Sequence, residues 1–370
     1  MSRPKASEEK IKYKALYNRI ADQIDTRDIW IGEKLSSESE LCAEYQISRQ
    51  TVRNALEALE RNGYITRVKG KGTFVKKEVV FNRTKTIGVC LSFMENYIFP
   101  EVLQGIEEVL AREGYGVDLR FGHNRVNNEK DFLQRVISLN LSGVIIEGIK
   151  SAFPNPNIKY YNELIRKKIP IIFVNNHYQN LDCNGIELDD NNLMYETTRL
   201  LIEAGHRKIG GLFKSDDHQG HQRYFGFVRA LLDHDVEVDE SHIYWYDTAN
   251  LAASNLRNAV IFDNFARIIA ENCTAVAFYN DLVAVQIIKR LRDLGKQVPE
   301  DISVIGFDHS DITKSIGLKI VSANHPKHKL GKKAAEMLVE LINDPKKLSS
   351  GFTIYRYPTE IIPGNSIKQI

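Results

Sequence analysis

The sequence predicts an α/β protein in which a small helix-and-wing domain precedes two lobes, each built on a doubly wound parallel sheet. Two observations lead to this fold class. The run from Leu35 to Val75 reads as two short helices followed by a pair of basic strands. From Thr86 onward, hydrophobic strands alternate with amphipathic helices in two successive sets, which is typical of parallel sheets covered on both faces.

The N-terminal domain begins with residues 11–26, where apolar side chains recur at helical spacing and predict a first helix. Ser37 and Glu40 have the spacing of a capping box and predict the start of a short second helix. Ser48 can cap a third helix that runs to about Asn62. The inward face of that helix is expected to carry Val52, Ala55, Leu56 and Leu59.

The start of this last helix places Arg49, Gln50 and Arg53 away from its apolar face. Arg and Gln side chains at the N-terminus of a helix can read guanine and adenine edges in the major groove. Two strands within residues 64–75 follow, joined by Lys69–Gly72, where Gly permits close approach to phosphates and Lys supplies charge. This is the layout of a winged helix-turn-helix, although a solvated charged helix in an ordinary small domain would carry the same basic pair.

This stretch resembles the DNA-binding domain of the GntR family of bacterial transcription regulators. The matching pieces are Leu35–Leu41, Ser48–Arg53, Gly63–Ile65 and Gly70–Thr73. The resemblance implies a set of residues that contact DNA, the last two of them on the wing: Ser48, Arg49, Gln50, Thr51, Arg53, Lys69 and Gly70.

Composition limits the class of protein further. Residues 1–77 hold 16 Lys and Arg against 11 Asp and Glu, a net charge of 16 − 11 = +5, so the remainder carries 2 − 5 = −3. A basic head on a mildly acidic body suits a DNA-binding module attached to a different domain. The four cysteines are scattered without a CxxC or Cys/His cluster, so neither a metal site nor a disulfide framework is expected. The chain shows no signal peptide and no apolar run approaching the roughly 20 residues of a membrane span, so we expect it in the cytoplasm.

Residues 1–77 are therefore expected to form the DNA-binding domain, 78–84 a linker, and 85–370 the two lobes. In the first set, strands are expected at 87–91, 117–121, 143–146 and 170–174, with helices at 100–113, 127–139 and 159–168. In the second set, strands are expected at 208–213, 243–246, 275–278 and 303–307, with helices at 190–204, 221–233, 256–271 and 281–294. Ligands of such sheets bind outside the carboxyl ends of the strands, which makes the cleft between the lobes the expected pocket.

Polar side chains collect after these strands. Asn280 and Asp308 each follow a strand, and Arg223 lies near the start of a helix after another. Every hydroxyl of a sugar both donates and accepts hydrogen bonds, so carboxylate, amide and guanidinium groups can pair with neighbouring hydroxyls. An aromatic face can cover the apolar C–H side of the ring. The sequence therefore predicts a site for a polyhydroxylated ligand.

Other polar residues in this part of the chain have a simpler interpretation. Asp190 and Asp281 each follow a strand, where a helix N-cap is the favoured role. Glu147 and Lys150 could form an ordinary surface pair. A structural role is also the favoured reading of His325 on pattern alone.

Residues 85–370 resemble the effector domain of the LacI/GalR family, which is related to periplasmic sugar-binding proteins. The matching pieces are Leu201–Ile209, Gln222–Phe227, Phe278–Asp281 and Val298–Asp308. The resemblance implies a two-lobed, periplasmic-binding-protein-like domain that dimerises and binds a sugar effector through Arg223, Asn280, Asp308 and His325.

The same resemblance implies that the chain crosses between the lobes three times, near residues 179, 309 and 325. Residues 327–343 would then return to the first lobe, and a tail strand at 354–357 would belong to the second. The hinge helix of LacI-type repressors is absent from this sequence, so their route from effector to DNA does not carry over.

The pairing of this head with this body is similar to the arabinose repressors of Gram-positive bacteria, with matches that include Tyr97–Pro100 and His325–Lys327. That resemblance implies L-arabinose as effector and adds Tyr97, Glu147 and Lys150 to the sugar site. We therefore expect a homodimeric repressor that binds a palindromic operator on double-stranded DNA and is released by L-arabinose. Another pentose, a hexose or a purine nucleoside as effector stays open.

An enzyme is the main alternative class. The sequence contains no GxxxxGK[ST] motif, no GxGxxG after a strand and no GxSxG turn, so neither catalytic residues nor a cofactor are expected. A cytoplasmic sugar-binding or sugar-modifying α/β protein would share the fold of the two lobes but would not need the basic head.

Overall fold

The computed structural model describes residues 5–25, 28–76, 83–93, 98–251, 256–349 and 351–370. The chain divides into two compact units, one comprising Met1–Thr84 with Glu163–Ile169 and the other Lys85–Asn162 with Pro170–Ile370. Most of the expected linker lies outside the described residues. Within them, no helix combines the length and the apolar character that crossing a lipid bilayer would require.

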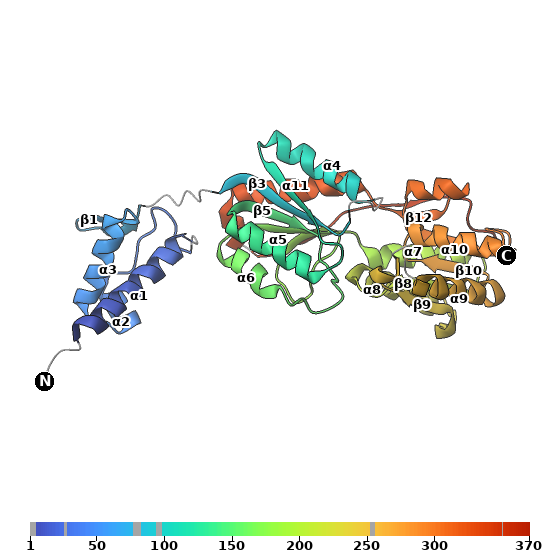
Figure 1. Ribbon diagram of the computed structural model, residues 1–370, viewed down its shortest axis with the longest axis horizontal. Helices are drawn as coiled ribbons and strands as arrows, with labels where there is room; N and C mark the ends of the chain where they lie inside the picture. The colour runs from blue at the N-terminus through green and yellow to red at the C-terminus, as the bar shows by residue number, and fades with distance from the viewer. Residues whose placement is uncertain (1–4, 26–27, 77–82, 94–97, 252–255, 350) are drawn as a thin grey trace. The chain divides into compact units, whose positions relative to one another are not determined.

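The N-terminal unit has the expected helix-and-wing layout (Figure 1). Its elements are α1 (Lys5–Asp25), α2 (Glu38–Tyr45), α3 (Arg49–Arg61), β1 (Ile65–Val68) and β2 (Gly72–Val75). The two strands pair antiparallel. The predicted inward face of α3 is buried, and it packs in one core with Leu16, Ile20 and Ile24 of α1. Burying each such side chain contributes about 1.5–3 kcal/mol, so this core holds the small domain together.

Helix starts in this unit follow from the predicted caps. The hydroxyl of Ser37 accepts from the backbone N–H of Glu40, while the Glu40 carboxylate accepts from the N–H of Ser37 at 2.6 Å, which completes the capping box. Ser48 accepts from the N–H of Thr51 at 3.1 Å and starts α3. Gln46 adopts φ 51° and ends α2, which turns the chain toward α3.

The first lobe is a six-stranded sheet in the order β13-β7-β6-β5-β3-β4. Its strands are β3 (Thr84–Leu91), β4 (Gly116–Phe121), β5 (Leu141–Ile146), β6 (Ile171–Val174), β7 (Asn184–Glu187) and β13 (Ile354–Arg356). Its helices are α4 (Phe99–Arg112), α5 (Val126–Ser138), α6 (Ile158–Arg166) and α11 (Lys327–Asn343). Strands β5 and β6 are buried at every residue, as continuous hydrophobic runs in a parallel sheet require.

The second lobe is a six-stranded sheet in the order β14-β12-β11-β10-β8-β9. Its strands are β8 (Ile209–Lys214), β9 (Ile243–Tyr246), β10 (Ala275–Phe278), β11 (Ser303–Asp308), β12 (Val321–Asn324) and β14 (Ile361–Ile362). Its α-helices are α7 (Asp190–Glu203), α8 (His218–Asp233), α9 (Leu256–Asn272) and α10 (Asp281–Asp293). Strand β14 is antiparallel to β12, whereas the other neighbours run parallel.

The chain crosses between the lobes after β7, after β12 and after β13. The second crossing follows Asn324, and none lies near 179 or 309, where two were expected. Strand β7, which was not predicted, keeps the chain in the first lobe until residue 187, because it pairs with β6. Strand β12 likewise continues the second lobe beyond 309. The tail strand β13 pairs with β7 in the first lobe, not the second, with Ile354 opposite Gly185.

Helix α11 lies beside α4 in the first lobe, although the two are far apart in sequence (Figure 1). Two glycines make this close approach possible. A Cβ atom on Gly105 would come within 2.0 Å of the backbone oxygen of His328, and one on Gly331 within 2.0 Å of that of Val102. The return of the chain to the first lobe is therefore fixed by backbone-to-backbone packing.

Candidate functional site

The exposed face at the start of α3 carries most of the residues expected to meet DNA. Ser48, Arg49, Gln50 and Arg53 are exposed to solvent. Thr51 is not among them, because it is 3% exposed and its hydroxyl lies 2.7 Å from that of Ser48. The expected DNA contact of the Thr51 side chain therefore does not fit this domain, where Thr51 supports the helix start instead.

Glu38 holds the two arginines of this face together, which the sequence did not predict. Its Oε2 atom accepts from Nε of Arg53 at 3.1 Å and from Nε of Arg49 at 3.3 Å. Burial works to raise the pKa of Glu38, but the two guanidinium groups outweigh it and the pKa is lowered. A guanidinium carries five N–H donors, so each arginine keeps other donors while its contact with Glu38 fixes the position of the side chain.

The wing presents its tip to solvent. Lys69 and Gly70 are both exposed, and Gly70 has φ 76°. Gly72 has φ 120°, and a Cβ atom there would lie 2.6 Å from Cε of Lys34. Any other residue at position 72 would strain the backbone and collide with Lys34. Glycine avoids both and lets Lys34 pack against the wing.

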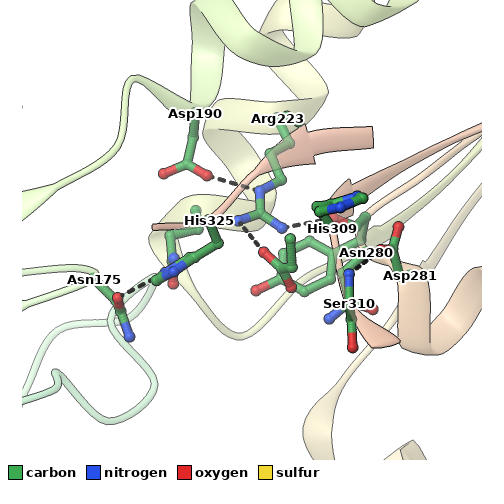
Figure 2. A network of polar contacts seen from close by, with 12 residues as sticks. Asn175, Asp190, Arg223, Asn280, Asp281, His309, Ser310 and His325 are labelled. Carbon is green, nitrogen blue, oxygen red and sulfur yellow. Dashed lines mark hydrogen bonds and ion pairs between the residues drawn. The ribbon is translucent and has the colours of Figure 1, made fainter. Parts of the chain in front are cut away.

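The second candidate site begins with Arg223 on α8, which is 1% exposed. Its Nε donates to Asp190 at 2.7 Å, its Nη1 donates to the carbonyl of Tyr279 at 2.6 Å, and its Nη2 lies 3.7 Å from Asp308 (Figure 2). The guanidinium also stacks on Phe307, 3.6 Å from the ring centroid. Burial alone would lower the pKa of Arg223, but the neighbouring negative charges outweigh it, so the group stays a fixed cation.

The expected cap assignments are off by one residue on both helices. Asp189, not Asp190, caps α7 by accepting from the N–H of Asn192 at 3.2 Å, which leaves Asp190 to pair with Arg223. Asn280 caps α10, and Figure 2 places it in the same group of side chains as Arg223.

Asp281 is therefore not a cap but an internal anchor. It accepts from the N–H of Ser310 at 2.7 Å and from the hydroxyl of Ser322 at 3.0 Å, and burial raises its pKa to about 7. It thereby fixes the chain that follows Asp308, a residue held at φ 87° at the end of β11.

His325 and Glu147 come from different lobes and are joined through one amide. Nε2 of His325 lies 3.1 Å from Oδ1 of Asn175 (Figure 2). Nδ2 of Asn175 donates to Glu147 at 3.4 Å. Nδ1 of His325 is buried and has no hydrogen-bond partner among the described residues. Burial lowers the pKa of His325 to about 4, so its ring is neutral at neutral pH. Asn175 was not predicted as a site residue.

Glu147 lies at the end of β5 and is 6% exposed. It accepts from the N–H of Ser92 at 3.0 Å, and burial raises its pKa to about 7. Lys150 is exposed and has φ 50°, so the alternative of a Glu147–Lys150 surface pair does not fit the burial of the carboxylate. Tyr97, the remaining expected sugar contact, lies outside the described residues.

A buried carboxylate supports the loop that carries Glu147 and Lys150. Glu129 on α5 is 0% exposed and accepts hydrogen bonds from Asn155, Asn157, Tyr161 and Tyr178. The hydroxyl of Tyr178 also accepts from the N–H of Ile149 at 2.7 Å. The position of the loop is thus tied to the interior of the first lobe.

We call Glu147, Asn175, Arg223, Asp308 and His325 the interlobe cluster. Arg223 lies on α8, and the other four lie at the carboxyl ends of strands or just beyond them. The cluster offers a fixed cation, carboxylates, an amide and an imidazole nitrogen without a partner. Such a mixture of donors and acceptors suits a neutral polyhydroxylated ligand. Among the described residues, no group of His, Cys, Asp and Glu could hold a metal ion.

Known proteins resemble this chain in both parts. Residues 12–75 match the model of bacterial regulatory proteins of the gntR family, and residues 198–367 match that of the periplasmic binding protein-like domain. An arabinose metabolism transcriptional repressor of Geobacillus stearothermophilus is 37% identical over 97% of this chain and 98% of its own. One from Halalkalibacterium halodurans is 33% identical over 91% of this chain and 90% of its own.

Solved structures share the fold of the two lobes. The transcription regulator CcpA of Lactococcus lactis superposes with a TM-score of 0.65 at 23% identity, over 77% of this chain and 100% of that one. The complex of the transcriptional regulator CelR with cellobiose has a TM-score of 0.66 at 20% identity, over 87% of this chain and 92% of that one. These structures establish the two-lobed architecture.

Proposed function

The chain belongs to the family of arabinose metabolism transcriptional repressors, and from that premise we propose that L-arabinose is the effector that releases it from its operator. It is a sugar-responsive DNA-binding repressor with a gntR-type head and a periplasmic-binding-protein-like body. The observation that supports a small sugar is the interlobe cluster, which brings together the fixed cation Arg223 of the second lobe and the contact between His325 and Asn175 of the two lobes.

On the DNA side, Arg49, Gln50 and Arg53 read base edges in the major groove, and Ser48 contacts the backbone at the start of α3. Lys69 and Gly70 meet phosphates from the wing, where charge and the lack of a side chain favour close approach. Thr51 acts within the domain, since its side chain is buried.

On the sugar side, Asp308 and Glu147 accept from hydroxyls, while Arg223 and Lys150 donate to them. Asn280 does both. The unpartnered Nδ1 of His325 and the aromatic face of Tyr97 complete this proposed site. A pentose that bridges residues from both lobes binds the closed arrangement better than an open one, which is the condition for a ligand to shift a conformational equilibrium.

The active species is a homodimer that acts in the cytoplasm. Two heads related by a two-fold axis fit the two half-sites of a palindromic operator, since dimer symmetry and operator symmetry correspond in helix-turn-helix proteins. Coupling of about 1–3 kcal/mol between sugar and DNA sites would change operator affinity about 5- to 150-fold.

The test uses the full-length protein and a fluorescent duplex selected from a random library for tight binding. L-arabinose should weaken binding in an anisotropy titration by the factor given above, and its mirror image D-arabinose should not. Release by a different sugar would identify that sugar as the effector in place of L-arabinose. Unchanged affinity with every sugar of a pentose and hexose panel would refute the sugar switch, and sedimentation as a monomer would refute the dimer.

A further inference from the structure

A cavity is lined by Lys150, which follows Glu147 of the interlobe cluster by three residues. Its volume is about 640 Å³, within the range of roughly 300–1,000 Å³ typical of small-molecule pockets. We call it the outer cavity. Its walls come from both lobes and include Phe93, His123, Phe153, Asp216 and Thr248.

Aromatic side chains from the first lobe form one wall. The rings of Phe93 and His123 lie edge to face, with centroids 6.0 Å apart. Phe153 is 52% exposed, so its ring is accessible to a ligand in the cavity. Aromatic faces of this kind cover the apolar C–H side of a sugar ring.

The second lobe contributes polar atoms that find no hydrogen-bond partner within the described part of the chain. Oδ2 of Asp216 accepts from Nδ2 of Asn124 at 2.6 Å and from the N–H of Thr248 at 3.1 Å. Among the residues that the structure describes, Oδ1 of Asp216 and the hydroxyl oxygen of Thr248 are buried and have no hydrogen-bond partner. The ammonium of Lys214 is 3.7 Å from that Oδ1, beyond hydrogen-bond distance. An unsatisfied buried group costs about 1–3 kcal/mol, so a ligand hydroxyl that reached either atom would bind favourably.

Charge around the outer cavity favours a neutral ligand. The cations Arg125 and Lys150 are balanced by the carboxylates of Asp216 and Asp247. A phosphate or carboxylate ligand would meet the two acidic side chains as well as the basic ones. A polyhydroxylated ring can instead use each of these groups as a donor or an acceptor.

The outer cavity is joined to the proposed sugar site through Lys150, which lines the cavity and whose backbone N–H donates to Asn124 at 3.2 Å. We propose that the outer cavity is a second saccharide subsite, so that the effector site accepts a disaccharide with one ring in the interlobe cluster and one outside it. This inference rests on the proposed function, because it requires a sugar in the cluster. The ligand that we propose for the two subsites together is a neutral disaccharide of pentoses.

The experiment compares L-arabinose with α-1,5-L-arabinobiose by isothermal titration of the full-length protein. The disaccharide should bind at least tenfold more tightly than the monosaccharide. Phe153→Ala should remove this advantage and leave L-arabinose affinity within twofold. Thr248→Val should also weaken the disaccharide selectively, because it removes the hydroxyl at nearly constant volume. Phe352→Ala is the matched control, since Phe352 is 45% exposed and does not line the cavity.

Several results would overturn the subsite while leaving the proposed function intact. These are a disaccharide that binds no better than L-arabinose, a disaccharide that does not bind, or a Phe153→Ala effect that is equal for both sugars or absent for both. If L-arabinose itself fails to bind, the proposed effector fails, and the subsite fails with it.

Discussion

Asn124 of the first lobe donates a hydrogen bond of 2.6 Å to the carboxylate of Asp216 in the second lobe. Asn124 adopts φ 52°, a left-handed conformation that asparagine tolerates better than most residues. The same side chain accepts from the N–H of Lys150, so it links the loop of the proposed sugar site to the opposite lobe. This contact stabilises only the arrangement in which the two lobes meet.

Replacing Asn124 should therefore weaken sugar binding without unfolding either lobe. Asn124→Ala should cost about 1–2 kcal/mol, or roughly 5- to 30-fold in L-arabinose affinity. Asn124→Asp should cost more, because two carboxylates would then face each other. Titration calorimetry measures the affinities, and circular dichroism checks the fold. Equal L-arabinose affinities for the two variants and the natural protein would contradict the inference that Asn124 holds the two lobes together.

Arg223 should be required for both stability and sugar binding. Arg223→Met leaves Asp190 buried without its cation, and breaking a buried pair in this way costs about 3–5 kcal/mol. Arg223→Lys keeps the charge but cannot reproduce the fork that reaches Asp190 and the Tyr279 carbonyl together. We expect the Lys variant to fold and to lose most sugar affinity. Urea unfolding measures the effect on stability, and calorimetry measures the effect on sugar affinity. An Arg223→Met variant as stable as the natural protein would contradict the predicted role of Arg223 in stability.

Glu147 should make stability depend on pH. Its folded-state pKa is about 7, raised from the usual 4.5 by burial, so between these values the folded protein holds a proton that the unfolded chain has lost. Stability relative to Glu147→Gln should be highest below pH 4.5 and should fall as pH rises to about 7, by about 3 kcal/mol at most. Urea unfolding of both proteins from pH 4.5 to 8 measures the difference. A constant difference across this range would show that the carboxylate titrates normally.

Much of this architecture could be predicted from local patterns. The helix caps, the hydrophobic strands and the helical spacing depend on neighbouring residues, and the helices and most strands lie close to the expected positions. Strand β7 was missed because Asn184 and Gly185 have low strand propensity, and only pairing with β6 makes them extended. The short strands β12 and β14 likewise depend on their partners in the sheet.

The candidate site was harder to predict from the sequence, because its contacts join residues that are far apart in the chain. Asp189 and Asp190 are both plausible caps, and only the approach of Arg223 from α8 decides which one remains for the site. Asn175 contacts His325 across 150 residues of sequence, and no local pattern predicts such a contact. Glu129 lies in a predicted amphipathic helix, yet its burial depends on four donors supplied by later segments.

Arg53 should contribute to sequence-specific DNA binding. If Arg53 reads a base, as proposed, Arg53→Ala should cost about 1–3 kcal/mol on the selected duplex, with little change on random DNA. Glu38→Gln should weaken specific binding less, because it removes only the anchor shared by Arg49 and Arg53. Anisotropy titrations on both duplexes test this order. Equal losses on specific and random DNA would assign Arg53 to phosphate contact instead.

Lys69 should contribute to DNA affinity without contributing to sequence selection. It is exposed at the wing, next to Gly70, where a lysine can approach a phosphate. Each phosphate contact releases condensed counterions, so Lys69→Ala should lower the slope of log affinity against log salt by about 1. The ratio of specific to random binding should stay the same. Lys346→Ala is a suitable control, because that lysine lies in the other unit of the chain. A changed specificity ratio with an unchanged salt slope would instead place Lys69 against a base.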